Sequence, residues 1–455
     1  MTLENTLTNN TTAEQAWQKS FIDTTLSSIK KWVWIYFWLL LFEGALRRWV
    51  LPSLAAPLLI IRDPVAVWIM ILAYKKNVFP VNFYIVIIGL ITVVSIYTAI
   101  SLGHHNIFVA LYGARIYLLH FPLIFVIGNI FTKKDVIKTG KVLLWISLPM
   151  TVLIIIQFYS TQNSWVNAGL GGDVEGAGFS GALGFFRPPG TFSFTTGVVV
   201  FYGLIACFIF YFWTTLHEVK KLLLFISTIC LFVAIPFSIS RSLFFEVIVS
   251  IIFFIAAITI TRLSIIKFFV PGLIVAGALV ILTNEDFSTT ATEAFTTRFE
   301  TASEAEGGAK GTLQDRYLGG MVTALENAAE QPFFGYGLGM GTNVGAQLLV
   351  GDRTIFLISE GEWGRVFGEL GAILGLSVIF IRLSVCWQML KESYRKLRQN
   401  DLLPWMLLSM GLLTIPQGQW AQPTALGFSV FIGGLIFASF NDEEDTLDDE
   451  ELEIT

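Results

Sequence analysis

Charged side chains are scarce in this sequence. Asp, Glu, Lys and Arg together make up 14% of its 455 residues, whereas hydrophobic residues make up 54%. A soluble domain carries about a quarter charged residues and at most about half apolar ones. The composition therefore excludes an ordinary soluble or nucleic-acid-binding domain and indicates a protein that is embedded in a membrane.

Cysteine and metal-ligand patterns are scarce too. The three cysteines, Cys207, Cys230 and Cys386, all lie in apolar runs, so we expect no disulfide framework. His104 and His105 are adjacent and have no further candidate ligands near them in the sequence, and there is no Asp-x-Asp pair of the kind used by metal-dependent sugar-nucleotide transferases. The sequence therefore predicts no metal site, and we expect no cofactor.

The chain is instead rich in long apolar runs. Most are about 17–25 residues long, which is enough for a helix to cross a bilayer core of about 30 Å. We therefore predict an all-α transmembrane bundle within residues 32–440. Its roughly twelve spans are expected at 32–51, 57–74, 81–101, 107–131, 140–158, 196–216, 221–237, 242–261, 265–282, 366–387, 402–417 and 423–440.

Lysine and arginine fall in alternate connections between these runs, as expected when cytoplasmic connections collect positive charge. The residues concerned are Lys19, Lys30, Lys31, Lys75, Lys76, Lys133, Lys134, Lys138, Lys141, Lys220, Lys221, Arg262, Lys267, Lys391, Arg395, Lys396 and Arg398. Lys310 is the one lysine expected on the opposite face. This pattern places both termini in the cytoplasm, with residues 1–31 as an N-terminal segment and 441–455 as an acidic, disordered tail.

Two long connections are then expected on the outer face, at 159–195 and 283–365. In the second, apolar residues recur at helical spacing from Leu313 to Ala329, which predicts an amphipathic helix that either covers the bundle or binds a substrate. The stretch GYGLGMG at 335–341 follows no predicted strand, so it is not a nucleotide-binding turn. Its backbone N–H groups could still contact an anion.

Arginine is the basic residue of the expected outer face. Arg187 lies in FFRPPGTFSF, before the run at 196–216, and Arg241 lies in SISRS, before the run at 242–261. A guanidinium stays charged and presents a fork of donors that suits phosphate oxygens. Two arginines on short turns could clamp a diphosphate. Alternatively, both are interfacial anchors that extend to lipid headgroups.

A charged residue inside an apolar run is a further candidate. Arg115 and His120 lie in the run at 107–131. Charges at such a depth usually face the interior of a bundle or a wet cavity. Arg115 therefore either contacts a ligand or pairs with a buried acid such as Glu246.

Acidic residues gather at the entry to the run at 366–387. In SEGEWGRVFGELG, residues 359–371, Glu362, Arg365 and Glu369 share one helical face. Glu360 or Glu362 could act as a general base at the membrane surface. The alternative for Glu369 is a structural ion pair with Arg365.

Several of these motifs together resemble the O-antigen ligase and polymerase superfamily. They are RPPGTFS with Arg187, SRS with Arg241, DRYLGGMVTALENAAEQPFFGYGLGMG at 315–341, which includes Arg316, and ELGAILGL at 369–376. The resemblance covers the third to the twelfth predicted span. EGALRRW at 43–49 looks like a feature of a less characterised branch of that superfamily.

The resemblance implies a bacterial enzyme of the cytoplasmic membrane that joins undecaprenyl-diphosphate-linked sugars at the outer face. It implies that Arg187 and Arg241 bind the lipid diphosphate, with Arg115, Arg316, Arg365 and Glu369 as supporting candidates. The implied reaction is a metal-independent, inverting glycosyl transfer. Its partners are the lipid-linked glycan and membrane lipid, with a flippase and a chain-length regulator as further candidates.

The sequence departs from the ligases of this superfamily at one position. They carry a histidine about nine residues before the glutamate that corresponds to Glu369, and here that position is Glu360. We therefore expect polymerisation of repeat units, with Glu360 or Glu362 as the base. The alternatives are transfer of a finished glycan to another acceptor and transport of a lipid-linked glycan. A transporter tends to show internal repeats, and no matching halves are visible.

Overall fold

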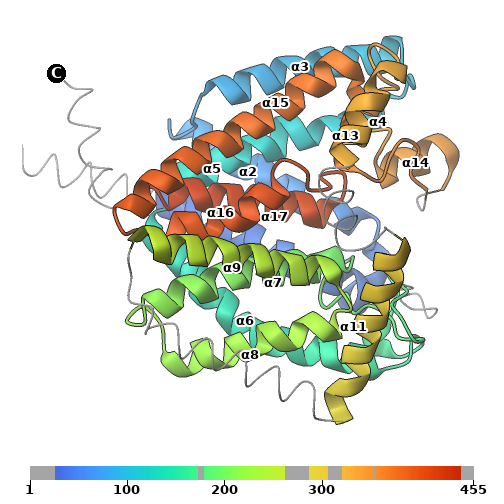
Figure 1. Cartoon of the computed structure of the whole chain (residues 1–455). Helices are drawn as coiled ribbons and strands as arrows, with labels where there is room; N and C mark the ends of the chain where they lie inside the picture. The colour runs from blue at the N-terminus through green and yellow to red at the C-terminus, as the bar shows by residue number, and fades with distance from the viewer. Residues whose placement is uncertain (1–25, 173–178, 262–285, 306–319, 353–354, 442–455) are drawn as a thin grey trace, which may run out of the picture.

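The computed structural model describes residues 26–172, 179–261, 286–305, 320–352 and 355–441 (Figure 1). These ranges form helices and loops, and the only β-type pairing among them is a single bridge between Ser180 and Phe186. The all-helical prediction is therefore confirmed for the part of the chain that the structure describes.

The described part of the chain begins with a helix at 26–45 that continues into the π-helical turn η1 (Leu46–Val50) and the 3-10 turns η2 (Pro52–Leu54) and η3 (Pro57–Ile60). The later helices are α2 (Arg62–Lys75), α3 (Phe83–Ser101), α4 (Ile107–Arg115), η4 (Ile116–His120), α5 (Phe121–Ile130), α6 (Lys133–Tyr159), η5 (Trp165–Asn167), α7 (Thr196–Thr214), α8 (Lys221–Phe237), α9 (Arg241–Thr261), α11 (Asp286–Ala305), α13 (Gly320–Glu326), η8 (Asn327–Glu330), α14 (Asn343–Val350), α15 (Glu362–Arg398), α16 (Leu403–Thr414) and α17 (Pro423–Ala438).

Several of these helices are suited to a membrane. Seven are long and apolar enough to cross one: Pro57–Lys75, Phe83–Ser101, Ile107–Ile130, Lys133–Tyr159, Thr196–Thr214, Arg241–Thr261 and Glu362–Arg398. The apolar helices α8, α16 and α17 are shorter. The predicted run at 265–282 lies outside the described residues, so the number of twelve spans stays a prediction.

The bundle is centred on α7, α16 and α17, whose side chains are mostly buried (Figure 1). Helices α5 and α17 pack closely against each other. A Cβ atom added to Gly434 of α17 would lie 2.6 Å from Cβ of Ile127, and one added to Gly128 of α5 would lie 2.5 Å from Cβ of Phe437. Small residues allow helix backbones to approach one another in membrane proteins, so these two glycines set the spacing of the pair.

The long helix α15 is interrupted near its start. Gly371 has φ 77° and ψ 178°, which is not helical. The glycine-rich loop 335–341 packs against this break, where Tyr336 N donates to Gly368 O at 2.7 Å and Gly337 N donates to Glu369 O at 3.1 Å. These contacts bind carbonyl groups that the break releases from the helix, as a bundle interior without water requires.

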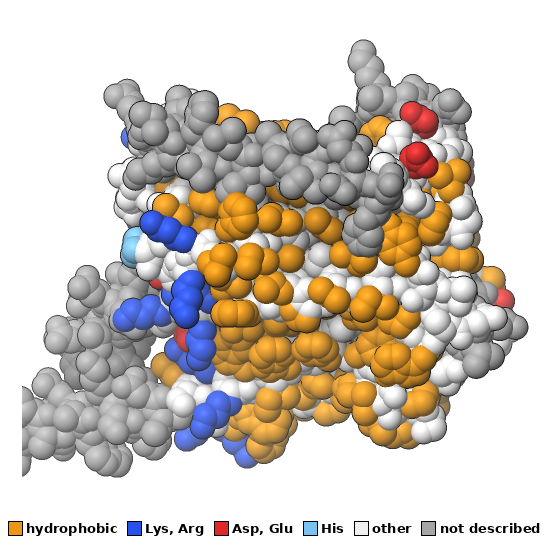
Figure 2. Space-filling view, turned by 90° about the horizontal axis from the view of Figure 1, so that it is seen from below, with side chains coloured by type: hydrophobic (Ala, Val, Ile, Leu, Met, Phe, Trp, Pro, Cys, Tyr) orange, Lys and Arg blue, Asp and Glu red, His pale blue; other side chains and the backbone are white. Residues whose placement is uncertain are grey.

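The surface separates apolar from basic side chains. Figure 2 shows a broad apolar band on one face, with Lys and Arg side chains gathered at one end of it. This arrangement is the one expected when one end of the bundle faces the cytoplasm. The assignment of that end to the cytoplasm stays a prediction.

The described part of the predicted amphipathic helix at 313–329 is helical, as α13 and η8, and α13 packs against α15. Met321 packs against the core and Ala324 is buried, whereas Val322 and Leu325 are exposed. Packing on α15 favours the interpretation that this helix covers the bundle. Residues 313–319 lie outside the described ranges.

Candidate functional site

Two glutamates and two arginines form a buried ion-pair network at the start of α15. Arg365 Nη2 lies 2.7 Å from Glu362 Oε1, and Arg365 Nη1 lies 2.6 Å from Glu369 Oε2. Arg382, further along α15, reaches Glu362 Oε1 with Nη2 at 2.8 Å. All four side chains are at most 2% exposed. The opposite charges balance, so this network stabilises the helix entry.

Backbone N–H groups donate further hydrogen bonds to the carboxylates of this network. Trp420 N donates to Glu362 Oε2 at 3.0 Å, and Gly341 N donates to Glu369 Oε1 at 2.9 Å. The Arg382 guanidinium carbon lies 3.6 Å from the centre of the Trp420 ring, a cation–π contact. The anion that the glycine-rich loop binds here is therefore the carboxylate of Glu369. Both oxygens of Glu362 already accept hydrogen bonds from protein groups.

Glu360 lies in a different environment, although it is two residues from Glu362. Its side chain is exposed, just before α15 begins. Gln419 Nε2 donates to the backbone oxygen of Glu360 at 3.1 Å, Gln422 Nε2 donates to Gln419 Oε1 at 2.6 Å, and Thr196 Oγ1 donates to Gln422 Oε1 at 3.3 Å. A line of polar contacts therefore connects the exposed glutamate to the first residue of α7.

Packing brings the segments of Arg187 and Arg241 together. The Phe158 ring stacks on Phe185 with centroids 4.6 Å apart and meets Phe237 edge-on at 5.2 Å. Phe185 precedes Arg187, and Phe237 lies at the end of α8 before Arg241. The bridge between Ser180 and Phe186 closes a short hairpin before Arg187. Arg298 of α11 contacts this hairpin, because its Nη1 donates to Gly181 O at 2.9 Å. Both arginine side chains are partly buried at this end of the bundle.

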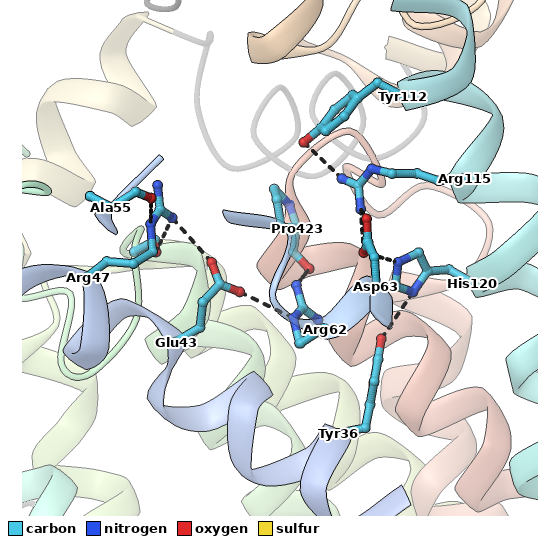
Figure 3. A network of polar contacts seen from close by, with 11 residues as sticks. Tyr36, Glu43, Arg47, Ala55, Arg62, Asp63, Tyr112, Arg115, His120 and Pro423 are labelled. Atoms are coloured by element: carbon cyan, nitrogen blue, oxygen red, sulfur yellow. Dashed lines mark hydrogen bonds and ion pairs between the residues drawn. The ribbon is translucent and has the colours of Figure 1, made fainter. Parts of the chain in front are cut away.

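Figure 3 shows a second cluster of charged residues, which the sequence analysis did not predict as one group. In its first half, Glu43 accepts from Arg47 Nη1 through Oε1 and from Arg62 Nε through Oε2, both at 3.2 Å. Arg47 Nε also donates to Ala55 O at 2.7 Å, and Arg62 Nη2 donates to the backbone oxygen of Pro423. These contacts join the first helix, the start of α2 and the start of α17.

The second half of the cluster surrounds Asp63. Arg115 Nη1 lies 3.0 and 3.1 Å from the two carboxylate oxygens of Asp63, and His120 Nε2 lies 2.9 Å from Oδ1. Tyr36 OH contacts His120 Nδ1 at 3.2 Å, and Tyr112 OH accepts from Arg115 Nη2 at 2.9 Å. Asp63 is the most exposed acid of the cluster, with a side chain 17% exposed.

The alternative that Arg115 pairs with an acid of another helix is therefore confirmed, but Glu246, the acid named as an example, is wrong. Arg115 pairs with Asp63, the second residue of α2, because α2 and η4 pack together. Glu246 lies on α9 against α7, where a Cβ atom on Gly203 would be 2.1 Å from its Oε2. This oxygen has no hydrogen-bond partner among the described residues.

The turn η1 adds one more arginine to the cluster. Arg48 Nη2 donates to Ser193 O at 3.2 Å, and its Nη1 lies 3.5 Å from Gly190 O. Arg47 Nη1 donates to Ser193 Oγ at 2.9 Å. The segment 190–193 begins at the glycine of RPPG, residues 187–190, so the cluster lies next to this turn.

The sequence indicates this cluster only when its charged residues are considered together. Glu43, Arg47 and Arg48 lie within one apolar run, and Arg62 and Asp63 lie within the next. Such charges are expensive in a membrane and usually pair with one another, so counting them together would have pointed to the cluster. Arg316 lies outside the described residues. Within the described ranges, no group of three or more His, Cys, Asp or Glu residues could hold a metal ion.

Comparison with models of known protein families gives no match for this chain. Comparison with characterised proteins gives none either.

Proposed function

We propose that the protein is a glycosyltransferase of the bacterial cytoplasmic membrane that polymerises undecaprenyl-diphosphate-linked oligosaccharide repeat units at the outer face. The motifs around Arg187, Arg241 and Glu369 and their resemblance to the O-antigen ligase and polymerase superfamily support this proposal. The topology that goes with it has both termini in the cytoplasm. A flippase and a chain-length regulator are its proposed partners.

The observation that carries the proposal is the meeting of the Arg187 and Arg241 segments through Phe158. Arg241 is the first residue of α9, and Arg187 lies shortly before α7. Helix N-termini favour anions, because their free N–H groups carry partial positive charge. An arginine at a helix start, with the segment of a second arginine packed near it, suits the diphosphate of a lipid carrier.

In the proposed reaction, a sugar hydroxyl oxygen of the acceptor attacks the anomeric carbon of a second, lipid-linked glycan. The bond from that carbon to the diphosphate oxygen breaks, and the electron pair leaves with undecaprenyl diphosphate. Arg187 and Arg241 stabilise the negative charge that develops on the leaving group. The hydroxyl proton passes to the carboxylate of Glu360. The energy of the lipid–sugar bond drives the transfer, so the reaction needs no nucleotide.

Between the two candidate bases, the geometry favours Glu360. Its side chain is exposed beside the start of α15, whereas both oxygens of Glu362 accept hydrogen bonds from Arg365, Arg382 and Trp420. A general base must come within hydrogen-bond reach of the proton that it takes. A buried carboxylate with every oxygen bound by protein donors does not offer that reach.

The test is the profile of undecaprenyl-linked glycans in cells that lack the protein and are rescued with wild type, with Arg241→Ala or with Arg395→Ala. Arg395 is an exposed residue near the far end of α15, where it pairs with Glu392, and serves as the control for loss of an arginine. We expect single repeat units to accumulate without the protein and long chains to return with wild type and Arg395→Ala only.

Other profiles would contradict the proposal. Accumulation of long lipid-linked chains in the deletion strain indicates a ligase instead. Accumulation of units that stay on the inner leaflet indicates a transporter. An unchanged profile excludes any role in building this glycan. Equal protein levels on immunoblots are required for each comparison.

A further inference from the structure

Arg48, which follows Arg47 of the charged cluster, has no acidic partner among the described residues. Glu43 is shared by Arg47 and Arg62, and Asp63 is held by Arg115 and His120. Neither carboxylate forms an ion pair with Arg48. Arg48 nevertheless is only 2% exposed and follows another buried arginine directly.

The contacts of Arg48 do not neutralise its charge. Its acceptors are two backbone carbonyl oxygens, at 3.2 Å and 3.5 Å, and the second distance is longer than the roughly 2.7–3.2 Å of an ordinary N–H···O bond. Its Nε has no hydrogen-bond partner among the described residues. A buried charge without a counter-charge is strongly destabilising. The α15 network, in which two glutamates offset two arginines, shows how this protein balances charge elsewhere.

The position of Arg48 indicates what would balance it. Its two carbonyl partners, Gly190 and Ser193, belong to the segment that begins at Arg187. Arg48 therefore lies against the end of the RPPG turn, of which Arg187 is the first residue. The residue lies in the π-helical turn η1, and single π-helical turns occur frequently at functional sites.

We propose that Arg48 is part of a phosphate-binding site beneath the RPPG turn, and that the site takes the diphosphate group of a lipid carrier. Guanidinium groups bind phosphate oxygens through two parallel hydrogen bonds. The bound diphosphate replaces the two carbonyl contacts and supplies the missing negative charge. The identity of the lipid rests on the proposed function, whereas the anion site follows from Arg48 and its neighbours.

The experiment measures binding of inorganic diphosphate to the purified protein in nanodiscs of phosphatidylcholine, a lipid without net charge. We expect saturable binding by wild type, at least tenfold weaker binding by Arg48→Gln, binding of intermediate strength by Arg48→Lys, and binding close to wild type by Arg395→Gln. Thermal unfolding without ligand is recorded for each variant, which separates loss of the site from misfolding. Arg48→Lys keeps the charge but not the planar fork of donors, so it separates the two contributions to binding.

Wild-type affinity in a folded Arg48→Gln protein would overturn the inference, as would absence of diphosphate binding by wild type. Displacement of inorganic diphosphate by undecaprenyl diphosphate assigns the site to the lipid carrier, and lack of displacement refutes that assignment. Arg48-dependent binding together with an unchanged glycan profile in cells would refute the proposed function and leave the anion site standing. Loss of polymerisation by Arg48→Gln together with unaltered diphosphate binding would refute the anion site and leave the proposed function standing.

Discussion

Arg365 holds Glu362 with two parallel hydrogen bonds, Nη2 to Oε1 at 2.7 Å and Nε to Oε2 at 3.0 Å. The two residues are three positions apart on α15, so the pair forms within the first turn of the helix. Trp420 and Arg382 bind the same carboxylate from outside that turn. Glu362 is thus the point where the start of α15 is attached to the loop between α16 and α17.

Replacing Glu362 with Gln should destabilise the fold strongly. The amide keeps the size of the side chain but removes the charge that Arg365 and Arg382 share. Breaking one partner of a buried ion pair costs about 3–5 kcal/mol, so we expect a much lower thermal unfolding midpoint in detergent. A midpoint within error of wild type would show that the network does not support the structure.

The matching change at Glu360 should act on activity instead. Glu360 is exposed and its side chain takes no part in the α15 network, so Glu360→Gln should unfold at the same temperature as wild type. Loss of a general base slows a reaction by roughly 10²–10⁴-fold, and we expect a decrease in that range in polymerisation by the purified enzyme. Glu326→Gln, at an exposed glutamate of α13, is the control. Normal polymerisation by Glu360→Gln would exclude this residue as the base.

The sequence predicted much of the α15 network and little of what surrounds it. Glu362, Arg365 and Glu369 follow helical spacing, so their common face could be predicted without a structure. Arg382 lies 20 residues beyond Glu362 and across the break at Gly371, and Trp420 N comes from another loop. Such contacts depend on how separate elements pack, which the spacing along one helix does not encode.

The same limit explains the wrong partner for Arg115. Run length and apolar composition identified the helices, because the bilayer sets both. They did not identify which helices are neighbours, so an acid on α9 was as plausible as one on α2. Glu246 turned out to lie against Gly203, whereas Asp63 faces Arg115. For the site itself, single residues could be predicted from the sequence, whereas their grouping depends on packing.

Gly371 should tolerate no side chain. Its φ of 77° is unfavourable for any residue with a Cβ atom, and that atom would lie 2.1 Å from Phe333 O. A backbone with φ 77° and ψ 178° is adopted by almost no residue except glycine, and it costs other residues roughly 1–3 kcal/mol. The overlap adds to this cost, so Gly371→Ala should lower the unfolding midpoint. Gly89→Ala is the control, because a Cβ atom there meets nothing within 4 Å. In the helix α3 it should stabilise by roughly 0.5–1 kcal/mol. Equal midpoints for the two variants would contradict the break described for α15.

The predicted topology can be tested with single cysteines. The native Cys207, Cys230 and Cys386 are buried, so the wild-type protein should react little with a membrane-impermeant maleimide. Leu183 lies in the hairpin before Arg187, and Asn400 lies between α15 and α16; both are exposed. In spheroplasts, Leu183→Cys should be labelled at once, and Asn400→Cys only after the membrane is permeabilised. The opposite pattern would place the arginine segments on the cytoplasmic side, where an acceptor presented at the outer face could not reach them. Equal labelling of both before permeabilisation would show that the number of spans between the two positions is wrong.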